Sequence, residues 1–558
     1  MRTKDSYNKR LKNLDSERSG FIDYWRELSD NILSSRGRFL TSDRNKGHKR
    51  NTKQFNNSAR LAVRTLASGM MAGITSPARP WFRLQTPDPK LNEVGAVKEW
   101  LNDVEVLMRE VYSQSNVYNT LHTVYSELAV FGTATMGIYE DYENVLWCKQ
   151  YTAGSYLLAM NGRSAVDTLY REYELTVAQL VTEFGIENVS QSVKGQFETG
   201  NTEAWHKVVH AIELNDGRDN TNPLAKHKKY RSVYYEADSD KENKTSFLRE
   251  SGYNEFPILA PRWDVTGEDV YATDCPAMTA LGDVKALQLL ERRKYQAVDK
   301  ITNPPMQAPS NLKAQVEGQG MVAGDIVYVD DTSAGGIRSL YDYRPDLNAI
   351  QAMIQETENR IDKAFYVDLF LMLANSDRKQ ITAREISERH EEKLLMLGPV
   401  LERLHTELLD PLIDRTFAMM QRAGILPEPP EELRDTELRI EYVSVLAQAQ
   451  RLVAVGAIER TAQFVGELSA VFPNARHKFD AEQAIDEYGA ALGLSPRVIR
   501  SDEAVAEIIA QEQQAMAQQQ QAEQMAQMGQ VAQQASQTDT SGKNALTDMM
   551  KMAGMNNG

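Results

Sequence analysis

NSARLAVRTLASGMMAGITSPARPWFRL, residues 57–84, joins a strongly periodic apolar pattern to an abrupt proline-rich end. Its small and apolar residues recur every three or four positions, which predicts a helix with one buried face. These positions are Ala59, Ala62, Val63, Leu66, Ala67, Met70, Met71 and Ile74. Gly69 and Gly73 lower helix stability, so they indicate close approach by a neighbouring segment. Pro77 and Pro80 should end the helix.

Length, charge and cysteine content limit the class of protein. The chain has 558 residues, of which 42% are hydrophobic and 25% charged, as expected for a soluble protein of several domains. Its formal net charge of −15 argues against tight, non-specific wrapping of nucleic acid. Cys148 and Cys275 lie far apart, which argues against a disulfide scaffold or a thiolate zinc site and favours a reducing cytosol. There is neither a secretory signal nor a run of about 18 apolar residues, so we expect no membrane-spanning helix and no membrane partner.

The first 275 residues have the pattern of a mixed α+β body. Helical periodicity covers residues 1–35, residues 57–76 and two further segments before Gly132, where the last of these helices should end. Short segments rich in β-branched and aromatic residues then predict strands, up to FPILAPRW at residues 256–263. We therefore expect an α+β fold that is mainly helical overall.

Two helical rods that flank a compact insert follow this body. Residues 276–302 have helical periodicity, and Pro276 suits the first turn of that helix. Residues 303–344 are rich in proline and glycine and contain one clear strand, GDIVYVDD. The second rod covers residues 345–370. Together these segments predict a helical hairpin with an elaborated tip.

The rest of the chain is predicted to be largely helical. Its segments are a connection at 371–381, a long helix at 382–426, a helical cluster at 427–500, a Gln-rich segment at 501–537 and a disordered end at 538–558. Thr382 and Glu385 have the spacing of a capping box at the start of the long helix. That helix should bend or break near Gly398 and Pro399, and again at Pro411. The Gln-rich segment is either a long polar helix or a disordered tract.

No motif gives positive evidence of catalysis or of a bound cofactor. There is no GxxxxGK[ST] loop, and GQGMVAGD has the wrong spacing for a phosphate cradle and leads into a strand. RHEEKLL lacks the second histidine of HExxH, and His206 with His210 has no third ligand, so we expect no metal centre. Four acids in RWDVTGEDVYATD could hold Mg²⁺ in a nuclease, although a solvated turn is the simpler interpretation. They are Asp264, Glu268, Asp269 and Asp274.

A basic stretch, SSRGRFLTSDRNKGHKRNTKQ, occupies residues 34–54. Its cations interleave with Phe39 and His48, so the stretch is either an anion-contacting arm or a solvated loop. The cations are Arg36, Arg38, Arg44, Lys46, Lys49, Arg50 and Lys53.

Three segments resemble the head-to-tail connector, or portal, proteins of short-tailed bacteriophages. They are residues 57–84, PRWDVTGEDVYATDCPAMTALGDVKALQ at 261–288, and QITAREISERHEEK at 380–393. The positions that carry the resemblance are Arg64, Gly69, Gly73, Pro77, Pro80, Trp81, Arg262, Trp263, Gly267, Glu268, Tyr271, Pro276, Thr382 and Glu385. One departure is Ala272, where relatives often carry glycine, and it concerns a local turn.

The resemblance implies a portal fold and a ring of twelve subunits around a channel for double-stranded DNA at one capsid vertex. The implied parts are an α/β wing at 1–275 with a long kinked wing helix at 382–426, a stem at 276–302 and 345–370, a small α/β clip at 303–344, a channel loop at 371–381, a helical crown at 427–500 and a possible helical barrel at 501–537. The implied partners are other copies of the chain, the DNA, a terminase packaging motor, capsid and scaffolding proteins, and tail adaptor proteins. The implied location is the virion, after assembly in the host cytoplasm. Pro77, Pro80 and Trp81 would form a clamp packed tightly within the wing.

A DNA conduit must let phosphates pass without holding them, so few cations and many acids in the channel would lower drag. In the implied channel loop LMLANSDRKQ, Arg378 and Lys379 are candidates for transient contacts with the DNA backbone, and a solvated turn is an equally good interpretation. The resemblance implies no enzymatic activity, because ATP hydrolysis would belong to the separate motor docked at the clip. A metal-dependent nuclease and a non-ring scaffold protein remain as alternatives from other functional classes.

Overall fold

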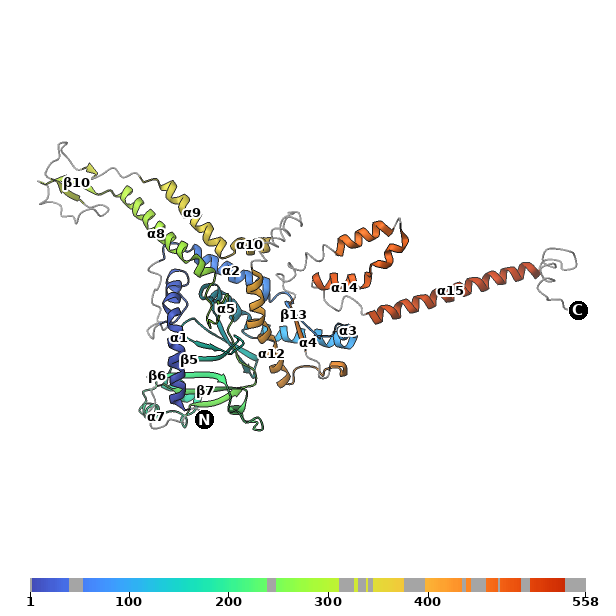
Figure 1. The fold of residues 1–558 in the computed structure, drawn as a ribbon, viewed down its shortest axis with the longest axis horizontal. Coiled ribbons are helices and arrows are strands. Elements are labelled where there is room, and N and C mark those ends of the chain that lie inside the picture. Colours follow the sequence, from blue (N-terminus) through green and yellow to red (C-terminus); the bar gives the residue numbers. More distant parts are fainter. Residues whose placement is uncertain are drawn as a thin grey trace. The chain divides into compact units, whose positions relative to one another are not determined.

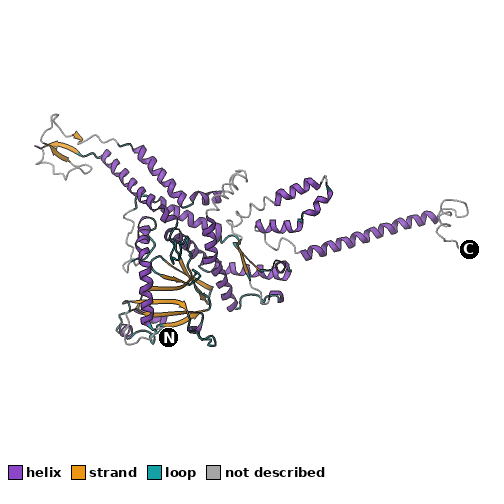
Figure 2. Ribbon diagram, in the orientation of Figure 1, coloured by secondary structure: helices purple, strands orange, loops and turns teal. Residues whose placement is uncertain are grey.

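The chain consists of two compact units. A computed structural model describes residues 3–39, 54–237, 247–310, 326–329, 338–339, 345–375, 397–433, 438–442, 458–469, 472–492 and 502–536. The first unit comprises Met1–Leu84, Asp103–Glu428 and Ile440–Gly456, and the second comprises Gln85–Asn102, Pro429–Arg439 and Ala457–Gly558. Helices predominate over strands, which confirms the predicted α+β, mainly helical class (Figure 2).

The helix predicted at residues 57–76 is α2 (Ser58–Ile74). Its predicted apolar stripe is buried except at Met71, which is half-buried, and the stripe packs mainly against α5 (Val117–Phe131). The preceding α4 (Gly95–Gln114) and the end of α5 at Gly132, with φ +71°, also agree with the prediction. Glycine adopts this left-handed conformation without the strain that a Cβ would add.

A five-stranded antiparallel sheet forms much of the first unit. Its strands are β4 (Leu157–Met160), β5 (Val166–Thr176), β6 (Trp205–Leu214), β7 (Tyr230–Glu236) and β8 (Arg249–Tyr253). The helix α1 (Lys4–Asn31) lies along one face of the sheet (Figure 1). Its side chains Tyr7 and Leu14 are buried against that face. Two short helices, α6 (Val177–Phe184) and α7 (Gln191–Glu198), bury the other. We refer to these helices and the sheet as the sheet sandwich.

A second antiparallel sheet lies beside α5 in the same unit. It has the order β3 (Val145–Tyr151), β2 (Thr135–Asp141), β9 (Ile258–Leu259). The strand expected from FPILAPRW is therefore only two residues long, since Pro257 and Pro261 cannot donate ladder hydrogen bonds. Two short strands, β1 (Phe82–Gln85) and β13 (Arg439–Tyr442), form a separate two-stranded sheet.

The predicted helical hairpin is present. Its first helix is α8 (Pro276–Thr302), with Pro276 in the first turn, and it packs along α9 (Leu347–Ala364) (Figure 1). At the tip, β10 (Met306–Pro309) pairs in parallel with β11 (Ile326–Val329) and antiparallel with β12 (Arg338–Ser339). The described strand β11 lies within the predicted GDIVYVDD.

The second helix of the hairpin is shorter than predicted. A continuous rod to residue 370 is wrong, because the chain turns at Tyr366, whose φ is +54°. A separate helix, α10 (Val367–Asn375), begins after this turn. A left-handed tyrosine is strained, so the surrounding contacts must hold it in place.

The long helix is described from residue 397 onward. Residues 397–404 are helical and include Gly398 and Pro399. A π-helical turn, His405–Leu409, leads directly into α12 (Asp410–Arg422). Of the predicted bend or break at Pro411, a break is therefore wrong, and the helix instead widens into the π-helical turn. The wider turn gives the proline ring space that an α-helical turn would deny it.

The described part of the second unit is mainly helical. It includes α3 (Pro89–Glu93), a helix at residues 458–469, the 3₁₀ segment Pro473–Lys478, α14 (Ala481–Leu492) and α15 (Asp502–Ser536). The Gln-rich segment is therefore a helix over 35 residues. Residues 538–558 lie outside the described part of the chain.

Candidate functional site

Arg262 ties the loop after β9 to the π-helical turn. Its side chain is only 3% exposed, and its Nη2 lies 2.6 Å from Glu407 Oε1. The Arg262 backbone N–H also donates to Glu407, and Nη2 donates to the Ser164 carbonyl at 2.8 Å. A buried ion pair is stable only when further hydrogen bonds satisfy both groups, and this pair has them.

Trp263 links the same loop to the turn between α9 and α10. Its buried indole stacks against Tyr366, with ring centroids 6.5 Å apart and 30° between the planes. Its backbone N–H donates to the Gly132 carbonyl at 2.7 Å. Trp263 therefore contacts the strained tyrosine that interrupts the second hairpin helix.

Tyr271 anchors the far end of the loop in the core. Its hydroxyl accepts a hydrogen bond from the Leu158 N–H at 2.9 Å, and its ring packs edge-on against Trp25 at 5.2 Å. Burial, the main cause, raises the pKa of Tyr271 to about 12. At the neighbouring position the Ala272 N–H donates to the Thr133 hydroxyl at 2.8 Å.

The departure at Ala272 has a structural explanation. Ala272 is fully buried, and a Cβ added to Gly132 would lie 2.8 Å from its methyl group. The alanine therefore fills the space that Gly132 leaves open, and the turn does not need a glycine at both positions.

The helix α2 is closely approached by a neighbouring segment, as its glycines indicated. A side chain at Gly69 would overlap the ring of Phe370 in α10, which explains the glycine by close approach. Gly73 is buried and Arg64 is exposed.

The predicted tight packing of Pro77, Pro80 and Trp81 is wrong for the two prolines. Trp81 is buried, and it stacks on Tyr112 with centroids 6.0 Å apart. Pro77 and Pro80 are both exposed, because α2 has already ended at Ile74 and the prolines lie in the turn that follows. Only the tryptophan packs into the unit.

The acids of the 262–274 loop do not converge. Asp264, Glu268 and Asp269 are exposed around a turn at Gly267, whose φ is +62°. Asp264 lies 3.9 Å from Arg403. Within the described ranges, no group of three or more His, Cys, Asp or Glu side chains is placed to hold a metal ion.

Asp274 and the two predicted histidines have structural partners. Asp274 accepts hydrogen bonds from the Cys275 N–H and the Thr279 hydroxyl at the start of α8. His206 bonds Gln196, and His210 stacks on Tyr234 with centroids 3.8 Å apart. These contacts give Asp274, His206 and His210 structural roles within the fold.

Comparison with known proteins identifies the family. Residues 4–499 match the family model described as bacteriophage head to tail connecting protein. The chain belongs to this family. It is thus a phage portal, or head-to-tail connector, and as a member of this family it is a structural component of the virion and not an enzyme.

Two relatives match over nearly their whole length. The portal protein of Salmonella phage epsilon15 is 47% identical over 558 residues, which covers 99% of this chain and 98% of the relative. The probable portal protein of Bordetella phage BPP-1 is 45% identical over 539 residues, covering 96% of each chain. Among the described helices of this connector, none is both long and apolar enough to cross a bilayer.

Four predicted residues of this connector lie outside the described part of the chain. They are Arg378 and Lys379 of the predicted channel loop and Thr382 and Glu385 of the predicted capping box. In contrast, three residues that complete the described contacts were not singled out in the sequence: Glu407, Tyr366 and Phe370. Each lies more than 100 positions from its partner, and no local pattern marks such a pairing.

Proposed function

We propose that twelve copies of this chain close into a ring at one capsid vertex of a short-tailed phage. The ring conducts double-stranded DNA during packaging and ejection. The observation that supports this most is the apolar surface of the α8–α9 hairpin. Large apolar side chains on this hairpin are exposed in the single chain, namely Leu289, Tyr295, Val298, Ile301 and Met353. Such a surface on one subunit is typical of an interface with another copy.

The parts of the ring follow from the order of elements. Residues 1–275 and 382–426 are the proposed wing, α8 and α9 the stem, and residues 303–344 the clip at its tip. Residues 427–500 are the proposed crown, and α15 extends it as a helical barrel. The absence of an apolar stripe on α15 suits a helix that is solvated on much of its surface.

The channel needs weak contacts with DNA. The net charge of −15 per subunit favours passage of phosphates without lasting attachment. Arg378 and Lys379 in residues 371–381 are the proposed transient contacts. If both are replaced by glutamate, we expect DNA packaging to be impaired while the rings stay intact.

The proposed partners are a terminase packaging motor at the clip, capsid and scaffolding proteins around the wing, and tail adaptor proteins. The chain would assemble in the host cytoplasm before it enters the virion. Since it carries no phosphate-binding GxxxxGK[ST] loop, the energy of packaging would come from the separate motor.

Electron microscopy and native mass spectrometry of the purified chain test the ring. We expect closed rings of twelve or a nearby number of subunits. Introducing charge on the hairpin with Tyr295→Glu and Val298→Glu should abolish them, since an interface cannot bury two unpaired carboxylates. Leu224→Glu, at a loop position as exposed as Tyr295, is the matched control and should leave rings intact. A chain that stays monomeric at every concentration, or rings that survive both hairpin substitutions, would overturn the proposal and favour a non-ring scaffold.

A further inference from the structure

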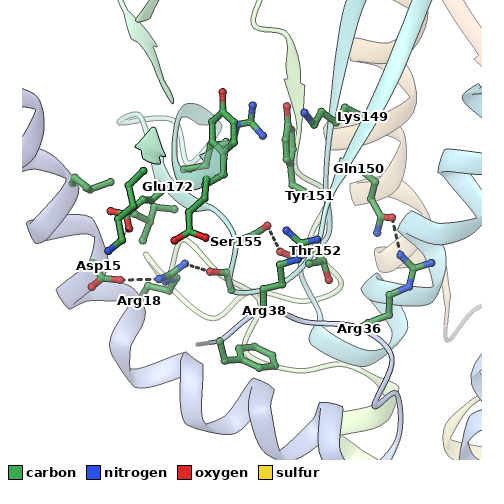
Figure 3. Close-up of a pocket in the computed structure, with 18 of the residues that line it drawn as sticks. Asp15, Arg18, Arg36, Arg38, Lys149, Gln150, Tyr151, Thr152, Ser155 and Glu172 are labelled. Carbon is green, nitrogen blue, oxygen red and sulfur yellow. Dashed lines mark hydrogen bonds and ion pairs between the residues drawn. The ribbon is translucent and has the colours of Figure 1, made fainter. Parts of the chain in front are cut away.

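A basic cavity of about 800 Å³ lies in the first unit, away from the hairpin (Figure 3). Its wall comes from α1, residues 36–39, β3, the turn that follows β3, and β5. Seven of its lining residues are cationic and three are acidic, in a chain whose net charge is −15. The cavity therefore concentrates positive charge against the overall balance of the protein.

Part of this charge is neutralised locally. Arg18 pairs with Asp15 at 2.7 Å (Figure 3). Lys207 lies 3.4 Å from Glu172. The Arg36 side chain donates to the neutral Gln150 side chain at 3.2 Å, and its charge also acts on the buried carboxyl group of Glu127. The side chains of Arg38 and Lys149 make no hydrogen bond or ion pair with any residue that the structure describes.

Arg171 is the buried cation of this cavity. It is only 8% exposed, and its guanidinium lies between the rings of Tyr151 and Tyr173, at 4.9 and 4.1 Å from their centroids. Its Nε donates to His210 Nδ1 at 3.3 Å, and no carboxylate among the described residues pairs with it. A buried charge without a counter-charge is costly, so an anion from outside would stabilise it.

The cations of the cavity also repel one another. Burial is the main cause that lowers the pKa of Lys149 to about 8, and the charge of Arg171 lowers it further. The charge of Glu183 acts in the opposite direction, but it does not offset these effects. Like charges kept close together are typical of sites that bind anions.

We propose that this cavity binds a phosphate ester of about nucleotide size. A phosphate group carries nearly two negative charges and three acceptor oxygens, so it suits the lining cations that have no carboxylate partner among the described residues, namely Arg38, Lys149 and Arg171. The volume is in the range of small-molecule sites and exceeds what one phosphate ion fills. A carboxylate, with a single charge and two oxygens, would leave part of the cationic cluster unpaired. All the lining residues lie between Leu11 and Lys207, outside the α8–α9 hairpin, so the proposal does not depend on ring closure.

Titration calorimetry on the full chain tests the site with three probes: pyrophosphate, a nucleoside triphosphate and a short single-stranded oligonucleotide. We expect at least one of these phosphate probes to bind. Arg38→Gln with Lys149→Gln should weaken that binding about tenfold or more, since each substitution removes a charged donor without breaking a described hydrogen bond or ion pair. The matched control is Lys9→Gln with Arg10→Gln, which removes two exposed cations of α1 outside the cavity and should leave the affinity unchanged.

The pattern of results identifies the ligand or rejects the site. If pyrophosphate binds with the same affinity as the nucleotide, the site recognises the phosphates alone. A higher affinity for the nucleotide means that the nucleoside is recognised as well. A higher affinity for the oligonucleotide identifies the ligand as a nucleic acid strand. Equal weakening by the cavity pair and the control pair would mean non-specific attraction and overturn the proposal. Failure of all three probes to bind would also overturn the proposal. A polyglutamate peptide serves as an anion without phosphate, and tighter binding of this peptide than of the phosphate probes would overturn the proposal as well. Circular dichroism of each variant checks that the fold is retained.

Discussion

The sheet sandwich and the α8–α9 hairpin bury their apolar side chains to very different extents. In the sandwich, Leu14 and Tyr7 of α1 are each 1% exposed against the sheet. In the hairpin, Leu289 is 47% exposed and Tyr295 is 58% exposed. One region thus completes its core within a single chain, while the other leaves apolar surface for a second copy. Fold stability and assembly should therefore respond to different substitutions.

The largest loss of stability should follow from breaking the Arg262–Glu407 pair. Glu407→Ala leaves the buried Arg262 guanidinium, which is 3% exposed, without its carboxylate, and we expect a loss of about 3–5 kcal/mol in the free energy of unfolding. Denaturant titration measures it. Glu183→Gln, which breaks the exposed pair with Arg249, is the control and should cost at most about 1 kcal/mol. Similar losses for both variants would contradict the role given to burial.

Glu127 should make the stability of the first unit depend on pH. It is fully buried, and burial, its largest influence, raises its pKa from 4.5 to about 7, against the lowering effects of Thr152 and Arg36. Between these values the unfolded chain releases the proton first, so the folded state loses stability as the pH rises from 4.5 to 7.

The variant Glu127→Gln tests this dependence. The neutral amide should remove this loss of stability. As the pH rises from 4.5 to 8, the free energy of unfolding of the variant should therefore increase relative to that of the native chain by up to about 3 kcal/mol. Unfolding curves across this range measure the difference. A constant difference between the two proteins would show that Glu127 does not titrate there.

A smaller effect is expected where α10 packs on α2. Gly69→Ala places a methyl group against the Phe370 ring, and we expect it to destabilise the fold by about 1–3 kcal/mol despite the better helix propensity of alanine. Phe370→Ala is itself destabilising because the ring is buried, but in its presence Gly69→Ala should cost less, since the overlapping ring is gone. The coupling in this double-mutant cycle is the measurement, and simple additivity would refute the contact.

Local patterns predicted the elements whose cause is local. The apolar stripe of α2 and the first-turn proline of α8 are visible in the sequence, and both helices match it closely. The helix α6 was missed, although Thr176 and Gln179 form a capping box that a closer search for start signals could have found. The turn at Tyr366 has no glycine or proline to mark it.

The contacts of the candidate site depend on distant residues. Arg262 stood out in the sequence, but its partner Glu407 follows 145 positions later, on a π-helical turn that no pattern predicted. The basic stretch at residues 34–54 suggested an anion contact, while Lys149 and Arg171 come from β3 and β5. Sequence periodicity assigns a residue to a face, and only the tertiary fold decides which faces meet.

The smallest effect on stability is expected in the hairpin, and it separates the two regions directly. Leu289→Ala removes a side chain that is half exposed in the single chain, so the free energy of unfolding of the unassembled chain should change by no more than about 0.5 kcal/mol. The same substitution at buried Leu14 should cost about 2–5 kcal/mol, because it opens a cavity under the sheet. For assembly we expect the reverse order, with fewer rings for Leu289→Ala at a protein concentration where folded Leu14→Ala still forms them. If Leu289→Ala destabilised the unassembled chain as much as Leu14→Ala, the hairpin would be part of the single-chain core, and its exposed surface would no longer support an interface.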